Sequence, residues 1–347
     1  MMTVSEIKRR FEDVVTREPM SVVFGLTSDR EIVARDLVQM PHLLIGGITG
    51  SGKSVFLHYL ICSFVKNSSP EEMRLVLIDP KKVEFGCYSK LPHLFAPVVD
   101  DINQIVDVMK FVEAEMNRRL YVFAEKGCRD ITAFNNLRDA PKLPRLIVVA
   151  DEISDCMLGT DGVFGAKISQ IAAIGRAAGI HLVLATSRLD AKVLPGNLKD
   201  NIPWRFSFKV CRKTDSLAVL DEIGAESLLA RGDALLKDSD GMKLRLWSPY
   251  FSDDAIKRTV DSAIGRYPGR KASVEIPQKQ DAESEDGLYV RAVELIRQTG
   301  CASLGCLQRE LEIGYNTAIR ITSLLEERGI IGPANDKGLR EILIKDA

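Results

Sequence analysis

The sequence lacks the features that mark secreted, metal-binding or membrane-spanning proteins. Its seven cysteines include no C-x-x-C pair, and together with four scattered histidines they show no metal-ligand spacing. No secretory signal opens the sequence, so we expect reduced thiols and a cytoplasmic location. No apolar run approaches the ~18 residues that a membrane span requires, so we expect no span in this chain.

The charge balance is also close to neutral, with a formal net charge of -1 over 347 residues. Such a chain does not attract nucleic acid through its overall field, so any DNA contact must come from local clusters of basic residues. The hydrophobic fraction of 46% is sufficient for a large core, and the length suggests about two domains.

The most informative stretch runs from Gly47 to Ser54 and fits the phosphate-binding pattern G-x-x-x-x-G-K-[ST]. An apolar run over residues 43–45 precedes it, and apolar residues with helical spacing follow over 55–65. Backbone N–H groups of such a loop surround a phosphate chain, and the helix start adds its positive dipole end. The pattern predicts that Lys53 contacts the β- and γ-phosphates of ATP and that the Ser54 hydroxyl binds Mg²⁺. The predicted nucleotide contacts in the loop are Gly47, Ile48, Thr49, Gly50, Ser51, Gly52, Lys53 and Ser54.

A second strand-like run ends in two acids, Asp151 and Glu152, about 100 residues after the loop. A carboxylate at this position can hold Mg²⁺ through water, and its neighbour can polarise the water that attacks the γ-phosphate. We assign Asp151 to the metal and Glu152 to the water. The pair favours ATP hydrolysis over the chemistry of a kinase.

Three further residues have both a structural and a functional interpretation. Thr186 ends an apolar run; it either finishes a strand or, beside the loop strand, points to the γ-phosphate. Arg176 precedes Gly179 at a helix end, where a basic residue complements the helix dipole. Lys213 follows the fifth apolar run and could equally be a loop residue. Arg176 and Lys213 could instead stabilise transition-state charge in the active site of a neighbouring subunit.

The pattern of apolar runs predicts an α/β architecture. The five runs cover residues 43–46, 75–79, 146–151, 181–186 and 206–210. They are continuously apolar and alternate with helical patterns, as expected of parallel strands covered on both faces in a three-layer sandwich. Before them we expect a short helix over residues 4–15 and a hairpin with strands over 21–26 and 31–36.

The end of the chain has the pattern of a winged helix. After a polar stretch with Pro268 and Pro277, helices are predicted over residues 288–297, 304–311 and 315–328. Short strands are expected over 330–331 and 339–344, so three helices are followed by a β-wing.

Several motifs in one order resemble the FtsK/SpoIIIE family of DNA translocases. They include Pro41-His-Leu-Leu, the phosphate loop, Leu-Ile-Asp79-Pro-Lys81, Asp151-Glu152, Arg176-Ala-Ala-Gly-Ile-His and Gly224-Ala-Glu-Ser-Leu-Leu. The resemblance implies a RecA-like P-loop motor over 37–265, a remnant of the α domain over 1–36, a linker over 266–286 and the γ winged helix over 287–347. The family's membrane domain and most of its α domain have no counterpart here.

The resemblance implies a hexameric ring that pumps double-stranded DNA with ATP and Mg²⁺. Arg176 would be a trans arginine finger and Lys213 a trans lysine. Arg188 and Lys199 would contact DNA phosphates in the pore.

In the winged helix, the third helix of a helix-turn-helix lies in the major groove. Asn316 could then contact adenine, and Arg320 guanine or phosphate. The family's module also contacts a site-specific tyrosine recombinase, so a docking role is an alternative.

The chain departs from the family pattern at Ser187, where a glutamine is usual, and at Glu310, Glu312 and Thr317 in the winged helix. Two other functions therefore remain alternatives: a DNA pump of the HerA or conjugative-coupling kind, and an ATP-controlled DNA-binding regulator that does not translocate.

Overall fold

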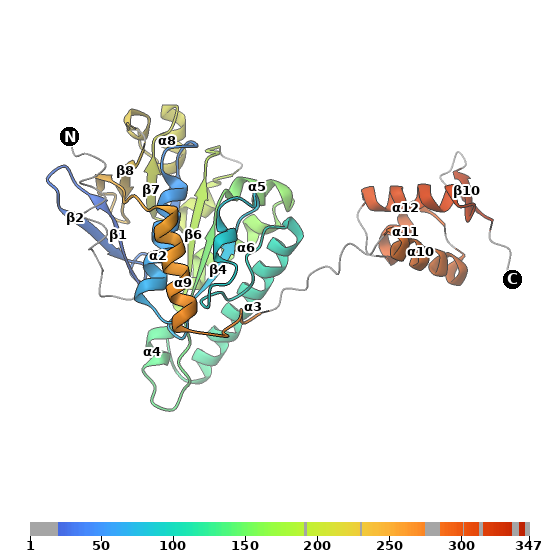
Figure 1. The fold of residues 1–347 in the computed structure, drawn as a ribbon, viewed down its shortest axis with the longest axis horizontal. Helices are drawn as coiled ribbons and strands as arrows, with labels where there is room; N and C mark the ends of the chain where they lie inside the picture. Colours follow the sequence, from blue (N-terminus) through green and yellow to red (C-terminus); the bar gives the residue numbers. More distant parts are fainter. Residues whose placement is uncertain are drawn as a thin grey trace. The chain divides into compact units, whose positions relative to one another are not determined.

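A computed structural model describes residues 20–190, 193–229, 231–274, 285–300, 302–311, 315–334 and 340–343 (Figure 1). The chain divides into two compact units, Met1–Ile276 and Pro277–Ala347. The helix predicted over residues 4–15 lies outside the described residues, as do residues 275–284 of the polar stretch before the winged helix. Among the described helices, none is long and apolar enough to cross a membrane.

A nine-stranded sheet forms the centre of the first unit, in the order β2-β1-β9-β8-β7-β3-β6-β5-β4. Its five parallel strands are those that the apolar runs predict: β3 (His42–Gly46), β4 (Met73–Ile78), β5 (Arg145–Ala150), β6 (Ile180–Thr186) and β7 (Trp204–Phe208). Every residue of these strands except Arg145 is buried, which explains the continuous hydrophobicity of their sequences.

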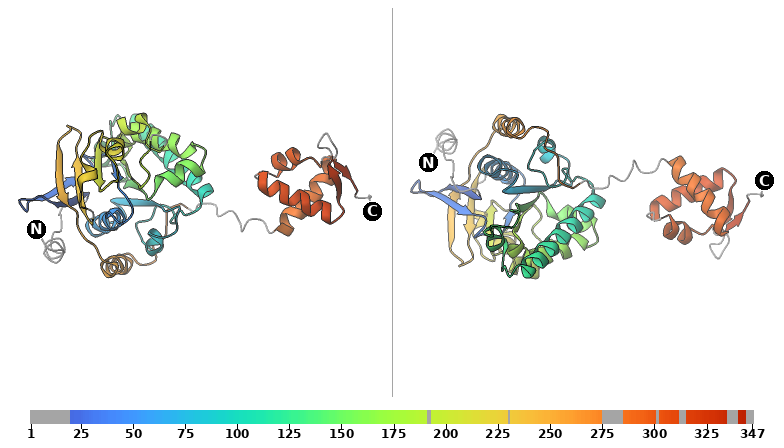
Figure 2. Two further views of the ribbon diagram at one scale, coloured as in Figure 1. Left: turned by 90° about the horizontal axis from the view of Figure 1, so that it is seen from above. Right: turned by 90° about the horizontal axis from the view of Figure 1, so that it is seen from below.

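Helices cover both faces of this sheet (Figure 2). One face packs against α2 (Lys53–Asn67) and α9 (Asp253–Arg266). The other packs against α3 (Ile102–Glu125), α5 (Ile153–Gly159), α6 (Val163–Ala178) and α8 (Lys213–Leu220). The connections contain η1 (Phe85–Tyr88), α4 (Ile131–Asn135), α7 (Gly196–Asp200) and η2 (Ala225–Ser227). The predicted three-layer sandwich is confirmed.

Two strands that we did not predict extend the sheet beyond β7. They are β8 (Asp233–Lys237) and β9 (Lys243–Trp247), which pair antiparallel with each other, while β8 pairs antiparallel with β7. Lys243 and Arg245 alternate with leucines along β9, where both basic residues are exposed, and β8 has a charged residue at each end. Their connection contains Asp240-Gly241, a hairpin signal that was available in the sequence.

The predicted N-terminal hairpin is present as β1 (Ser21–Leu26) and β2 (Ile32–Asp36). It continues the same sheet, because Leu26 of β1 pairs with Trp247 of β9. The family resemblance implies that residues 1–36 lie outside the motor domain, whereas β1 and β2 belong to the sheet of the first unit.

A cluster of phenylalanine rings shows that the sheet curls around α2. Phe24 on β1 lies 5.2 Å from Phe206 on β7 between ring centroids, although two other strands separate β1 from β7. Three flat strand spacings would cover about 14 Å. Phe56 of α2 lies 5.4 Å from Phe24 and 4.6 Å from Phe206, so the helix fills the inside of the curl.

The second unit contains three helices and a two-stranded wing. The elements are α10 (Glu285–Thr299), α11 (Leu304–Glu310), α12 (Tyr315–Glu327), β10 (Ile331–Ala334) and β11 (Arg340–Ile342). The strands pair antiparallel, and the helices bury a small apolar core that includes Leu307, Ile321 and Leu325. This order of elements is that of the predicted winged helix.

Replacing Phe206 by Ala should lower the free energy of unfolding of the first unit by about 3–5 kcal/mol, because the substitution leaves a cavity in the ring cluster. Urea denaturation followed by intrinsic fluorescence measures this loss. The control is Tyr121→Ala on α3. Tyr121 is 66% exposed, so its substitution should change the free energy of unfolding little. Equal effects of the two substitutions would contradict the packing described here.

Candidate active site

The phosphate-binding loop lies between β3 and α2, in the strand–loop–helix context that the sequence predicts. Gly50 and Gly52 adopt φ values of 77° and 121°, which side-chain-bearing residues rarely adopt. A Cβ atom on Gly52 would also lie 3.1 Å from the backbone nitrogen of Gly232. These glycines allow the backbone to curve closely enough for its N–H groups to surround an anion.

Lys53 is the first residue of α2 and is buried. Its Nζ donates hydrogen bonds to the carbonyl oxygens of Gly47, at 2.7 Å, and Ile48, at 3.3 Å. Burial lowers the pKa of Lys53, although the nearby carboxylates of Glu152 and Asp151 oppose this shift. The ammonium group therefore lies inside the loop, next to the free N–H groups at the start of α2.

Neighbouring strands hold the loop in place. The N–H of Ile48 donates to the carbonyl of Lys209 after β7, at 2.9 Å. The N–H of Gly232, directly before β8, donates to the carbonyl of Ser51 at 2.9 Å. The unpredicted hairpin β8–β9 therefore contacts the phosphate loop directly.

Asp151 follows the last residue of β5 and is buried. Burial raises its pKa to about 6, and the neighbouring carboxylate of Glu84 contributes in the same direction. Its carboxylate forms no hydrogen bond or ion pair with any residue in the part of the chain that the structure describes. A buried carboxylate in this setting is stabilised by a divalent cation, so the residues fit the predicted Mg²⁺.

The described residues contain no cluster of three or more metal-ligating side chains.

Glu152 adopts a left-handed backbone conformation, with φ 56°, which directs its side chain toward the end of β6. Its Oε1 accepts hydrogen bonds from Ser154 Oγ at 2.7 Å, Thr186 Oγ1 at 2.9 Å and the Ser187 N–H at 3.0 Å. Its Oε2 accepts from Ser187 Oγ and from Lys81 Nζ, the latter at 3.1 Å. Burial alone would raise the pKa of Glu152, but the hydrogen bonds from Ser187, Ser154 and Thr186 lower it to about 2.

These groups surround a single cavity of about 570 Å³. Its lining residues are Thr49, Gly50, Gly52, Lys53, Ser54, Val55, Lys81, Val83, Glu84, Asp151, Glu152, Ser187, Arg231, Gly232, Trp247, Ser248, Pro249 and Tyr250. The structure thus brings together the loop, both predicted acids and Ser54. A cavity of this size, lined by both charged and apolar side chains, suits a nucleoside triphosphate.

Thr186 lies beside the loop strand as expected, since Gly46 of β3 pairs with Thr186 of β6. It is fully buried, however, and its hydroxyl is directed at Glu152. Ser187, rather than Thr186, lines the cavity. A contact between Thr186 and a nucleotide therefore stays a prediction.

The sequence predicts no role for three parts of the cavity lining: Lys81, Ser187, and the wall formed by residues 231–232 and 247–250. Lys81 follows β4 as Asp151 follows β5, so its position at the same edge of the sheet was a usable signal. The wall follows the hairpin β8–β9, and it was missed together with those strands.

Arg176 and Lys213 are exposed, in the last turn of α6 and at the start of α8. Neither lines the cavity of its own chain. Within the described residues neither forms a hydrogen bond or an ion pair through its side chain. Their action in a neighbouring subunit stays a prediction.

The two predicted pore residues are paired with acids of their own chain. Arg188 Nε lies 2.7 Å from Asp190 Oδ2, and Lys199 Nζ lies 2.7 Å from Asp221 Oδ1. Asp221 also pairs with the buried Arg205. To bind DNA, Arg188 and Lys199 would each have to leave the carboxylate of the acid partner and pair with a phosphate instead.

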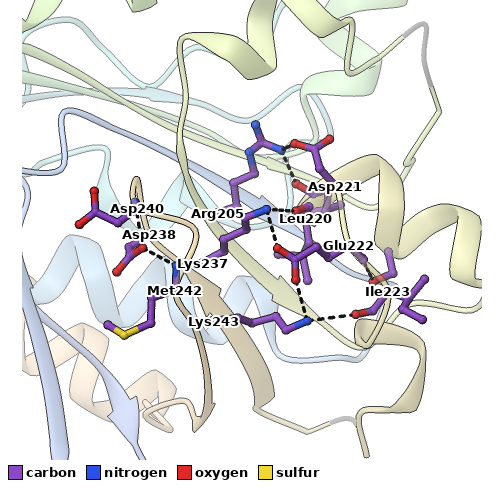
Figure 3. A network of polar contacts seen from close by, with 12 residues as sticks. Arg205, Leu220, Asp221, Glu222, Ile223, Lys237, Asp238, Asp240, Met242 and Lys243 are labelled. Atoms are coloured by element: carbon purple, nitrogen blue, oxygen red, sulfur yellow. Dashed lines mark hydrogen bonds and ion pairs between the residues drawn. The ribbon is translucent and has the colours of Figure 1, made fainter.

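Figure 3 shows that the pairing of Asp221 with Arg205 is part of a larger network of polar contacts. Next to Asp221, the carboxylate of Glu222 pairs with Lys237, at 2.8 Å, and with Lys243, at 3.0 Å. Glu222, in the turn after α8, therefore connects this turn to the end of β8 and the start of β9 through ion pairs.

In the second unit, Asn316 and Arg320 both belong to α12, the expected recognition helix. Arg320 is exposed. The side chain of Asn316 lies outside the described residues. Their contacts with bases stay predictions.

Comparison with known proteins gives two family matches. A model of the FtsK/SpoIIIE family matches residues 6–191, and a model of the Ftsk gamma domain matches residues 283–345. The second match coincides with the winged helix of the second unit.

Individual relatives agree with these matches. The chain is 38% identical over 359 residues to a protein named DNA translocase FtsK from Bacillus anthracis, covering 100% of this chain and 45% of the relative. It is 38% identical over 333 residues to DNA translocase SpoIIIE of Bacillus subtilis, covering 92% of this chain and 42% of the relative. The chain thus spans less than half the length of these relatives.

Among solved structures, the fold is similar to the conjugation coupling protein TcpA of pCW3, in its monomer form with ATPγS. The TM-score is 0.64 at 28% identity, and the match covers 72% of each chain. The cytoplasmic domain of the type VII secretion ATPase EccC of Thermomonospora curvata shares the fold, with a TM-score of 0.67 at 24% identity over 80% of this chain and 34% of that one.

Substitution of Lys53 by Ala should weaken nucleotide binding by about 100-fold, because the β- and γ-phosphates lose a buried cation. Glu152→Gln should keep nucleotide binding but slow hydrolysis roughly 100-fold or more, because the amide cannot accept a proton from water. Fluorescent-nucleotide binding and phosphate release measure the two effects, with circular dichroism to verify folding. Near-normal turnover by Glu152→Gln would show that another group activates the water.

Proposed function

The chain belongs to the FtsK/SpoIIIE family, and on that premise we propose that it is an ATP-driven motor that moves double-stranded DNA. The observation that carries the proposal is the single cavity in which Lys53, Asp151 and Glu152 meet. The relatives named DNA translocases supply the substrate class. Their substrate implies a cytoplasmic location, where duplex DNA is found.

In this proposal, each group of the cavity has one task during hydrolysis. Lys53 turns from its loop carbonyls to the β- and γ-phosphates and neutralises their charge. Ser54 and Asp151 are the residues that would hold Mg²⁺, which supplies additional neutralisation of phosphate charge. Glu152 is ionised, so it orients the attacking water and accepts its proton.

We further propose that the motor acts as a ring of subunits, six by the family resemblance. The exposed Arg176 and Lys213 lie outside the cavity of their own chain, so each is available to reach the γ-phosphate in a neighbouring copy. There they would stabilise charge that develops as the phosphate leaves.

The proposed DNA contacts are of two kinds. Arg188 and Lys199 would bind phosphates in the ring's pore without reading sequence, so binding weakens as salt rises. Asn316 and Arg320 on α12 would read base edges, or α12 would instead dock a site-specific tyrosine recombinase.

Hydrolysis by the full chain should rise many-fold with duplex DNA and should increase further with duplex length, because a motor hydrolyses ATP throughout its travel. Steady-state phosphate release, with short and long duplexes at equal base-pair concentration, measures this. A regulator that uses ATP only to set its oligomeric state gives a rate independent of duplex length. That outcome would contradict translocation while leaving nucleotide hydrolysis intact.

Mixing Arg176→Ala protein with Lys53→Ala protein should restore part of the DNA-stimulated activity that each lacks alone. In a mixed ring, the intact Lys53 of one subunit meets the intact Arg176 of its neighbour. The control mixture of Lys53→Ala with Glu152→Gln should stay inactive, because both changes damage the same half of the site. If rings form at every ratio and no activity returns, Arg176 does not act across the boundary.

A further inference from the structure

The carboxylate of Glu152 accepts more hydrogen bonds than a water-orienting base can keep. Oε1 accepts from Ser154, Thr186 and the Ser187 N–H, and Oε2 accepts from the Ser187 hydroxyl and Lys81. A carboxylate offers about four acceptor positions. None is left for the attacking water, so one donor must leave before hydrolysis.

Among these donors, Lys81 is the one that can leave at least cost. Ser154 is buried, so its hydroxyl would lack water as a new partner if it left Glu152. The hydroxyl of Thr186 can donate to the carbonyl of Arg188 instead, at 3.0 Å, but the four donors that remain still fill the acceptor positions of Glu152. The side chain of Lys81 is 49% exposed, so its ammonium group can be solvated or can turn to another anion. Lys81 is also the only charged donor of the set, and an anion attracts it most strongly.

Hydrogen bonds to Asp79 fix the backbone of the loop that contains Lys81, whereas the side chain of Lys81 is half-exposed. The buried carboxylate of Asp79 accepts hydrogen bonds from the N–H groups of Glu84, at 2.8 Å, and Phe85, at 2.9 Å. The N–H of Lys82 donates to the carbonyl of Asp79 at 3.0 Å. The loop after β4 therefore positions Lys81 in the lining of the cavity that the phosphate loop residues also line.

We propose that Lys81 is a γ-phosphate-binding residue that controls when Glu152 can act. Without a γ-phosphate, Lys81 holds Oε2 of Glu152. When a nucleoside triphosphate binds, the ammonium group of Lys81 moves to the γ-phosphate, and Oε2 becomes free to accept a hydrogen bond from the attacking water. A diphosphate lacks the group that attracts Lys81, so Glu152 stays blocked. This proposal rests on the hydrolysis proposed for the same cavity.

The test compares Lys81→Met, which keeps the length of the side chain but removes its charge, with Lys82→Met as a matched control. Lys82 is the adjacent residue, but its Nζ pairs with Asp100 at 3.2 Å and it does not line the cavity. Affinities of the full chain for ATPγS and for ADP are measured separately. Lys81→Met should reduce the preference for ATPγS over ADP by about tenfold or more, whereas Lys82→Met should not change it.

Steady-state kinetics separate this role from a purely structural one. Loss of the γ-phosphate contact should raise KM for ATP and lower kcat, and Lys81→Arg should restore most of the ATPγS preference. If Lys81 only kept Glu152 in place, kcat would fall with the ATPγS preference unchanged, and the proposal would be wrong. The binding comparison needs no turnover, so it tests Lys81 even if the chain hydrolyses no ATP.

Discussion

The register of the parallel strands is the constraint on which the whole cavity depends. β6 lies between β3 and β5, so the end of β6 separates the phosphate loop from the two acids. Ala150 pairs with Leu184. Glu152, two residues later, therefore lies beside Thr186 and Ser187, whose hydroxyls donate hydrogen bonds to it. A shift of one residue would turn every side chain of a strand to the opposite face, and Glu152 would lose these donors. Both faces are closely packed, so such a shift would place side chains of the wrong size in the core.

Burial acts on the two central charges of the site in opposite senses. It lowers the pKa of Lys53 and raises the pKa of Asp151, because a low-polarity environment disfavours the charged form of each. A phosphate chain and a divalent cation supply the opposite charges that these two groups require. Glu152 differs, since its donors outweigh burial and keep it ionised. Neighbouring carboxylates thus have distinct chemical properties because of their hydrogen bonds.

Much of this arrangement could be predicted because its signals are local. The phosphate loop, the acid pair, the five buried strands and the winged helix each depend on residues close together in the sequence. The contact between Lys81 and Glu152 joins residues 71 positions apart. Both residues follow predicted strands, which places them at the same edge of the sheet, but the sequence does not show that β4 and β5 are neighbours. Nor does it show that Lys199 lies beside its acid partner Asp221, which follows a different helix. The hairpin β8–β9 was missed because its exposed face carries charges where the central strands are uniformly apolar. The place of β1 in the sheet depends on its pairing with β9, so it could not be predicted once β9 was missed.

The backbone of Gly232 limits how far the cavity can widen. Its N–H donates to the carbonyl of Ser51 in the phosphate loop, and its carbonyl accepts the N–H of Ser248 in the cavity wall, at 2.7 Å. Two hydrogen bonds through one residue thus join the phosphate loop to this part of the wall. A ligand that pushed the loop away from Ser248 would have to break one of these bonds.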